Sequence, residues 1–324
     1  MKRKLIISAT ALIAILIIAL LLLTAPTQRH VDIDGSKVGA FPICGREGQI
    51  ELSPGFTLRV STGTSISHIT PSTLEWLRSR GCVTDSTRRP MLGRDANDDI
   101  DLSTRVYRIN LPASTYRFSY DSLAEHTVSA HNPKAPLNYI RDVDVVIAPP
   151  SEGNVLGIDF LKRFVVEMNY ADQSLTFHNE VPDGYELVGN ISVTNPLINI
   201  LLGRTLYGLE MKVDHEPYTF RLNSEIPGVA LKLPIKRLNT TENVHHRHED
   251  IVDLLGRQHQ AVIDPSAWVE FGNRAGSRTV HYFSGEDEDF EINPLVFFDQ
   301  DLVIDFANRN IYLRPFYKIN NLEN

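Results

Sequence analysis

Cysteine is scarce in this chain, because only Cys44 and Cys82 occur among 324 residues. Two cysteines exclude a disulfide-rich scaffold and a zinc site with four cysteine ligands.

Positive charge is also in deficit, since 32 Lys and Arg stand against 40 Asp and Glu, and Lys2, Arg3 and Lys4 supply three of those cations. The remaining chain is too acidic for sequence-independent binding of nucleic acid, which needs clustered Lys and Arg. We therefore expect no nucleic-acid partner.

Hydropathy excludes two further classes of protein. Hydrophobic residues make up 42% and charged residues 22% of the chain, and the mean hydropathy is −0.15, so the chain is neither disordered nor a multi-pass membrane protein.

One apolar run, Leu5 to Leu23, matches a hydrocarbon core about 30 Å thick. It is longer than the apolar region of a signal peptide, which is typically about 7–15 residues. We expect an uncleaved signal anchor over residues 5–24, with a removed signal peptide as the alternative.

The basic residues 1–4 set the predicted orientation, because positive charge favours the cytoplasmic side. Residues 25–35 would then be a linker, and the rest of the chain would lie on the periplasmic or extracellular side. The lipid bilayer is thus an expected partner through residues 5–24. That compartment permits a disulfide between Cys44 and Cys82, while two buried thiols remain an equal alternative.

The rest of the chain is predicted to be mainly β, with few short helices. Apolar segments at residues 50–52 and 56–60 flank Ser53-Pro54-Gly55, which predicts a hairpin. Residues 71–77 predict a short helix, with Thr70 as its N-cap and Gly81 beyond its end. Further strands are expected at residues 106–109, 116–120, 143–147, 165–168 and from 187 onward. The His-rich segment 240–253 is expected to be a loop that leads into a helix.

An internal repeat divides this β region into two parts. Residues 165–177 match residues 301–313 at an offset of 136, since both read as a strand, an Asp or Asn turn and a second strand. Residues 56–62 match residues 218–224 at an offset of 162. The two matches occur in the same order. They predict two related closed β lobes, at residues 36–180 and 181–318, followed by a tail at residues 319–324.

The first lobe resembles a known family. Arg59-Val60-Ser61-Thr62-Gly63-Thr64-Ser65, followed by a short helix, resembles the active-site loop of retropepsin-like and pepsin-like aspartic peptidases. About 95 residues later, Asn154-Val155-Leu156-Gly157-Ile158-Asp159-Phe160-Leu161 resembles the hydrophobic-hydrophobic-Gly element of that family, in the form common in bacterial members. The resemblance covers most of residues 45–178. It is much fainter in the second lobe, where it rests on Leu222-Asn223-Ser224 and on the closing strands.

The resemblance implies a site in which two carboxylates, one from each lobe, face each other over one water molecule. Here Ser61 and Asn223 occupy both expected aspartate positions, Glu225 replaces the glycine of the second motif, and Asn293 stands opposite Gly157. No catalytic residue is therefore predicted to be intact. The resemblance assigns the active-site-loop positions to Ser61, Thr62, Gly63, Thr64, Ser65, Asn223, Ser224 and Glu225. It assigns loop support to Val155, Leu156 and Gly157.

The favoured hypothesis is a membrane-anchored, aspartic-peptidase-like protein that has lost catalysis and binds an extended polypeptide between its lobes. By the resemblance, residues 105–130 would supply a flap over that groove. One alternative is an active aspartic-type endopeptidase, which requires a carboxylate pair elsewhere or in a dimer. The other is a structural envelope protein without a groove. No cofactor is expected.

Other polar groups are weaker candidates. Ser61 lacks an identifiable base that would make it a nucleophile, and His68 and Asp159 are expected to be structural. His245, His246 and His248 do not form the helical i, i+4 pair typical of zinc, so no metal site is predicted. The acidic run at residues 286–289 is expected to be a solvated loop.

Overall fold

The computed structural model describes residues 37–40, 48–53, 56–89, 93–94, 100–101, 104–113, 117–118, 129–130, 138–169, 174–194, 204–226, 229–238, 247–252, 258–272, 274–284, 290–298 and 300–314. The predicted anchor at residues 5–24 and Cys44 lie outside these ranges. Among the described helices, none has both the length and the apolar character needed to cross a bilayer. The anchor and the Cys44–Cys82 disulfide therefore stay predictions.

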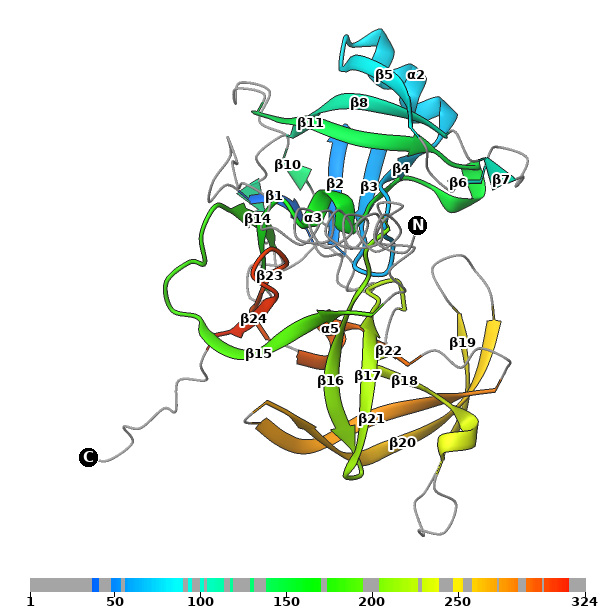
Figure 1. The fold of residues 1–324 in the computed structure, drawn as a ribbon, viewed down its shortest axis with the longest axis vertical. Coiled ribbons are helices and arrows are strands. Elements are labelled where there is room, and N and C mark those ends of the chain that lie inside the picture. Colours follow the sequence, from blue (N-terminus) through cyan, green and yellow to red (C-terminus); the bar gives the residue numbers. More distant parts are fainter. Residues whose placement is uncertain are drawn as a thin grey trace, which may run out of the picture.

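The chain is mainly β, as predicted, and its elements fall into two groups that Figure 1 shows one above the other. The first group comprises β1 (Lys37–Ala40), β2 (Gly48–Ser53), β3 (Phe56–Val60), β4 (His68–Ile69), α2 (Pro71–Ser79), β5 (Val83–Arg89), β6 (Gly93–Arg94), β7 (Ile100–Asp101), β8 (Thr104–Ala113), β9 (Arg117–Phe118), β10 (Ser129–Ala130), β11 (Asn138–Ile147), η1 (Pro150–Glu152), β12 (Val155–Leu156), α3 (Ile158–Leu161), β13 (Val165–Asn169) and β14 (Ser174–His178).

The second group comprises β15 (Glu186–Val193), β16 (Tyr207–Val213), β17 (Glu216–Leu222), β18 (Leu231–Pro234), η2 (Ile235–Arg237), β19 (Arg247–Val252), β20 (Gln258–Phe271), β21 (Arg274–Phe283), β22 (Glu291–Ile292), α5 (Pro294–Phe298), β23 (Leu302–Asp305) and β24 (Asn310–Leu313).

Both groups use the same order of strand pairing. In the first, β12 lies between β3, to which it is parallel, and β4, to which it is antiparallel, and β4 is parallel to β11. In the second, β22 lies in the same way between β17 and β18, and β18 is parallel to β21. Two segments with one pairing order are two related lobes. The repeat seen in the sequence therefore corresponds to a structural repeat.

A shared sheet joins the lobes. Its strand order is β1–β14–β13–β23–β24–β15, with β13 of the first lobe antiparallel to β23 of the second. In this pairing Glu167 lies opposite Val303. These two residues are also equivalent by the repeat offset of 136, so the approximate two-fold axis between the lobes passes between them.

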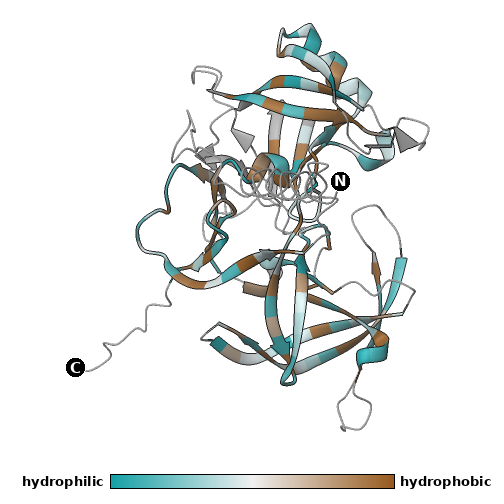
Figure 2. Ribbon diagram, in the orientation of Figure 1, coloured by the Kyte–Doolittle hydropathy of each residue, from teal (hydrophilic) through white to brown (hydrophobic). Residues whose placement is uncertain are grey.

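Apolar side chains fill both lobes. Strand β16 alternates buried and exposed positions, and Figure 2 shows the same alternation of hydropathy along the long strands of the second lobe. In the first lobe Phe160, Phe164 and Phe177 pack together, with ring centroids 4.8–5.5 Å apart. Full burial of one such side chain contributes about 1.5–3 kcal/mol, so this cluster is a main source of stability.

Local signals for the helix are confirmed. Thr70 precedes α2, and its hydroxyl accepts a hydrogen bond from the N–H of Thr73 at 3.4 Å. Pro71 occupies the first helical position, where a missing N–H costs nothing. Gly81 follows the helix with φ +66°, a conformation that glycine adopts without strain.

Two predictions are wrong. Residues 247–252, predicted as part of a loop that leads into a helix, form strand β19, and the next described element is strand β20. The long strand β20 supplies β19 with hydrogen-bond partners that the local sequence does not reveal. Residues 105–113 belong to β8, where Ile109 and Leu111 are fully buried, so this part of the predicted flap is a core strand. Most of the rest of the range to 130 lies outside the described residues.

A partly buried carboxylate on the joining sheet, that of Glu167, makes stability depend on pH. Glu167 Oε2 lies 2.6 Å from His178 Nε2, and Oε1 accepts the Tyr185 hydroxyl at 2.7 Å. Burial opposes ionisation of Glu167, but the hydrogen bonds from His178 and Tyr185 outweigh it, so the pKa of this carboxyl lies below its usual value. The stabilisation is present above about pH 4.3, the unfolded pKa, and is lost as the pH falls through the folded pKa.

We therefore expect Glu167→Gln to lower the free energy of unfolding by about 1–2 kcal/mol at pH 7, and by less at pH 3.5. Urea unfolding at the two pH values measures the effect. Glu180→Gln is the matched control, because Glu180 is exposed. A loss of equal size at both pH values would contradict this assignment.

Candidate functional site

Two loops, one from each lobe, bind each other where the lobes meet. The backbone N–H of Thr62 donates to Ser224 Oγ at 3.1 Å, and the N–H of Ser224 donates to Thr62 Oγ1 at 3.0 Å. Ser224 Oγ also donates to the carbonyl of Val60 at 3.4 Å. Thr62 and Ser224 are 162 positions apart, which is the offset between residues 56–62 and their repeat at residues 218–224. The contact is therefore reciprocal about the two-fold axis. We call this pair of contacts the loop interlock.

Ser61 and Asn223 lie beside the interlock, one on each loop. Ser61 is 1% exposed, and its hydroxyl oxygen accepts hydrogen bonds from the N–H groups of Gly63 and Thr64 at 3.1 and 3.0 Å. Asn223 Oδ1 accepts from the N–H of Glu225 at 3.0 Å. A Cβ on Gly63 would lie 2.3 Å from Asn223 Oδ1, so only glycine allows the loops to approach this closely. The structure thus brings the loops of Ser61 and Asn223, the two positions singled out in the sequence by resemblance, close together.

The strands behind the loops hold Ser61 and Asn223 in equivalent ways. The N–H of Ser61 donates to the carbonyl of Leu156 at 2.9 Å, and the N–H of Asn223 donates to the carbonyl of Ile292 at 2.8 Å. Val155 and Leu156 are fully buried. Sequence reasoning placed loop support at residues 155–157, and in the structure those residues contact the first loop.

The lobes differ in the residue that follows this strand. A Cβ on Gly157 would lie 2.5 Å from the carbonyl oxygen of Thr64, so the first loop packs against bare backbone. In the second lobe the corresponding residue is Asn293, which is fully buried and whose side-chain amide donates to the carbonyl of Ile226 at 3.0 Å. Asn293 therefore holds its loop by a side chain where Gly157 acts by close approach.

Asp159 serves the first loop as a hydrogen-bond acceptor. One of its oxygens accepts from the N–H of Ser67 at 2.9 Å, from the Ser67 hydroxyl at 2.6 Å and from the N–H of Phe160 at 2.8 Å. Burial raises the pKa of this carboxyl, although these hydrogen bonds and nearby Lys162 oppose the rise. The geometry is that of a structural acceptor that fixes the start of α3.

A buried charge cluster lies directly behind Asn223, and sequence reasoning missed it. Oε1 of Glu291 accepts hydrogen bonds from Arg221 and from Asn223 Nδ2, which lies 3.1 Å away. Oε2 of Glu291 accepts a hydrogen bond from Lys232 Nζ at 3.1 Å. The side chain of Glu291 is 5% exposed. The sequence did carry one signal for this cluster. Glu291 is a carboxylate between two apolar residues, Phe290 and Ile292, and it stands where the first lobe has Val155.

Glu291 is held in its ionised form. Burial opposes ionisation, but the charges of Lys232 and Arg221 outweigh burial, and the pKa of Glu291 lies below its usual value. Both of its oxygens are occupied. A carboxylate in this state cannot carry the shared proton that a peptidase dyad requires.

Glu225 is the remaining carboxylate at the loops. Thr64 Oγ1 donates to Glu225 Oε1 at 3.0 Å across the lobe junction, which adds a side-chain link to the interlock. At these loops the two lobes thus meet through small hydroxyl groups and one carboxylate, in addition to the sheet that joins them. No pair of carboxylates faces each other here among the residues that the structure describes.

The other sequence candidates lie apart from the loops or remain undescribed. His68 lies on β4 with Nε2 3.8 Å from Glu152, and His248 is exposed on β19. Cys82 is buried and its thiol contacts the carbonyl of Arg80 at 3.8 Å. His245 and His246 are outside the described residues. Within the described ranges, no three His, Cys, Asp or Glu side chains gather as a metal site would require.

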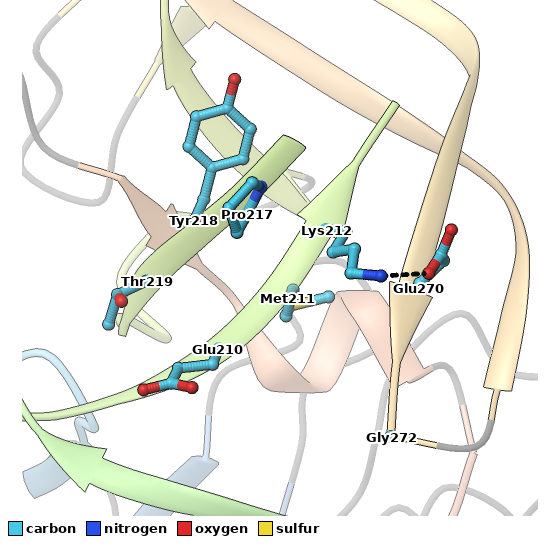
Figure 3. A pocket seen from close by; sticks show the side chains of 8 residues that line it. All are labelled: Glu210, Met211, Lys212, Pro217, Tyr218, Thr219, Glu270 and Gly272. Atoms are coloured by element: carbon cyan, nitrogen blue, oxygen red, sulfur yellow. Dashed lines mark hydrogen bonds and ion pairs between the residues drawn. The ribbon is translucent and has the colours of Figure 1, made fainter. Parts of the chain in front are cut away.

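A shallow hollow of about 350 Å³ lies on the second lobe, away from the interlock residues. Figure 3 shows that β16, β17 and the end of β20 line it, with Lys212 and Glu270 joined across it at 3.1 Å. Its polar groups are mostly exposed, and two of them, Lys212 and Glu270, form an ion pair with each other. Nothing in it matches the buried, convergent polar groups of a catalytic site.

Comparisons with known proteins give little guidance. No family model and no curated protein matches the sequence. Among solved structures, the chain is similar to basic 7S globulin from soybean, with 9% identity, coverage of 87% of this chain and 95% of that chain, and a TM-score of 0.42. It is also similar to EDGP, with 10% identity, coverage of 88% and 96%, and a TM-score of 0.43. A likeness at this level carries no inference about function.

Proposed function

We propose that this chain is a two-lobed, aspartic-peptidase-like protein without peptidase activity, which binds an extended polypeptide between its lobes. The loop interlock is the observation that supports the proposal most directly. It joins the two loops reciprocally about the approximate two-fold axis, while Ser61 and Asn223 stand where the resemblance places the carboxylates.

The chemistry of the two positions argues against hydrolysis. A serine hydroxyl and an asparagine amide do not titrate usefully between pH 3 and 7, so neither can activate a water molecule or protonate a leaving amine. Loss of general acid–base help alone costs about 10²–10⁴ in rate, and loss of both members of a dyad costs more. Glu291 does not replace them, because two cations hold it ionised.

Polypeptide binding would not depend on the catalytic carboxylates, because it uses different chemical groups. An extended peptide is held by main-chain hydrogen bonds and by pockets for alternate side chains, and neither requires a carboxylate dyad. Thr64 and Glu225 are only partly buried at the lobe junction and offer a hydroxyl and a carboxylate to such a chain. With residues 5–24 as a membrane anchor, this binding site would face the periplasmic or extracellular side.

The first test is a cleavage assay of the full chain in detergent against a broad peptide library from pH 3 to 7, with and without a pepstatin-type inhibitor. We expect no cleavage above background from protein shown to be folded by circular dichroism. Pepstatin-sensitive cleavage would overturn the proposal and favour the active endopeptidase.

The second test measures binding of fluorescein-labelled casein, an unfolded polypeptide, by fluorescence anisotropy. Thr64→Trp places a large side chain at the lobe junction, and we expect it to weaken binding at least tenfold. Glu75→Trp on the exposed side of α2 is the matched control and should bind as the wild type does. If casein does not bind the wild-type chain at millimolar concentration, the structural envelope protein becomes the better interpretation.

A further inference from the structure

A small apolar hollow lies beneath the β20–β21 hairpin of the second lobe. Its volume is about 70 Å³, and it is lined by Val269 and Phe271 of β20 and by Phe297 and Phe298 of α5. Gly276 of β21 lies opposite Val269 and leaves the space open, since a Cβ there would meet only an Arg278 nitrogen, at 3.9 Å. A hollow of about 150 Å³ holds a benzene ring, so this one accepts a branched aliphatic group but not an aromatic ring.

Two cations stand at the mouth of this hollow. Arg274 and Arg278 belong to its lining, and they flank Gly276 on the same face of β21. Arg278 lies with its guanidinium carbon 5.8 Å from the centre of the Phe297 ring, and its Nη1 donates to the carbonyl of Ser277 at 3.0 Å. Among the described residues, neither arginine forms an ion pair. In a chain with a net charge of −8, two guanidinium groups without an ion-pair partner among the described residues thus lie together.

Hydrogen-bonding groups also lack partners here. Gln300 Oε1, in the lining of the hollow, is buried and accepts no hydrogen bond. Strand β21 pairs with β18 only from Val280 to Phe283, so residues 274–279 have β20 on one side and no described strand on the other. Such an edge offers its N–H and C=O groups to an added strand.

We propose that this hollow binds the carboxyl terminus of an extended peptide whose last residue is leucine or valine. Arg278 and Arg274 bind the terminal carboxylate, since guanidinium groups form strong charge-assisted hydrogen bonds to carboxylates. The aliphatic side chain fills the space under Gly276. Gln300 Oε1 accepts an N–H of the peptide, and the preceding residues extend along the edge of β21 that has no described strand beside it. This site is separate from the binding site proposed between the lobes.

The test uses fluorescein-labelled hexapeptides and the full-length chain in detergent, with binding followed by anisotropy. We expect the peptide that ends in leucine to bind at least tenfold more tightly than the same peptide with a C-terminal amide. Peptides that end in glycine or tryptophan should also bind at least tenfold more weakly. Equal binding of the amide, or of the tryptophan peptide, would overturn the proposal.

Variants test the two parts of the site separately. Gly276→Val fills the hollow and should abolish binding, whereas Ser277→Val should not change it, because Ser277 is exposed and does not line the hollow. Arg278→Gln should weaken binding about tenfold, whereas exposed Arg105→Gln in the first lobe should have no effect. Circular dichroism checks that each variant is folded. Binding that survives both Gly276→Val and Arg278→Gln would overturn the assignment. Thr64→Trp should leave binding at the hollow unchanged, because Thr64 lies at the lobe junction and not in the lining of the hollow.

Discussion

Replacing Glu291 with glutamine is expected to lower the free energy of unfolding by about 3 kcal/mol at pH 7. The substitution keeps the shape of the side chain but removes the charge that faces Arg221 and Lys232. The Lys232 side chain is 15% exposed and that of Arg221 32%, so water compensates the two cations only in part. Removing one partner of a buried ion cluster is costly for this reason.

The effect should depend on pH in a defined direction. Because the folded pKa of Glu291 lies below the usual value, its stabilisation is present above about pH 4.3 and is lost as the pH falls through the folded pKa. The unfolding free energies of wild type and Glu291→Gln should therefore converge in acid. A constant difference down to pH 3 would show that shape, and not charge, is responsible.

The measurement can be restricted to one lobe. The chain has two tryptophans, Trp76 in α2 of the first lobe and Trp268 in β20 of the second. In a Trp76→Phe background, urea unfolding followed by fluorescence reports on the second lobe, which holds Glu291. Glu249→Gln is the control, because its contact with Arg247 is exposed and 3.8 Å long, and it should change stability by less than about 0.5 kcal/mol.

Breaking the loop interlock should uncouple the lobes. Thr62→Val leaves the N–H of Ser224 without its acceptor, and Ser224→Ala does the same to the N–H of Thr62. A buried donor without a partner costs about 1–3 kcal/mol, so each single variant should be destabilised by that amount. The double variant should lose less than the sum, because both substitutions act on one reciprocal contact.

The two tryptophans distinguish uncoupling from general loss of stability. In the double variant, the transitions seen by Trp76 alone and by Trp268 alone should move apart along the urea axis relative to wild type. Thr84→Val is the control, because the Thr84 hydroxyl makes an exposed hydrogen bond to the carbonyl of Arg108 at 3.2 Å. If the double variant behaves as Thr84→Val does, the interlock does not couple the lobes.

Much of the fold follows from short-range signals. The pairing of β2 with β3 follows from the Pro-Gly signal in the sequence between them, and α2 follows from Thr70, Pro71 and Gly81. The offsets of 136 and 162 predicted two related lobes, and the register of β13 on β23 agrees with the first of these offsets. Strand β19 was missed because its conformation depends on β20 and not on its own residues.

The absence of aspartate at positions 61 and 223 is a property of the sequence alone, and with it the expectation that catalysis is lost. Only the tertiary structure decided which groups meet: Thr62 with Ser224, Asn223 with Glu291, and Arg278 with the hollow beneath Gly276. The physical reason is range. Turns, caps and alternation are set by residues a few positions apart, whereas these contacts join segments brought together by the packing of whole strands, and one sequence carries no local signal for that pairing.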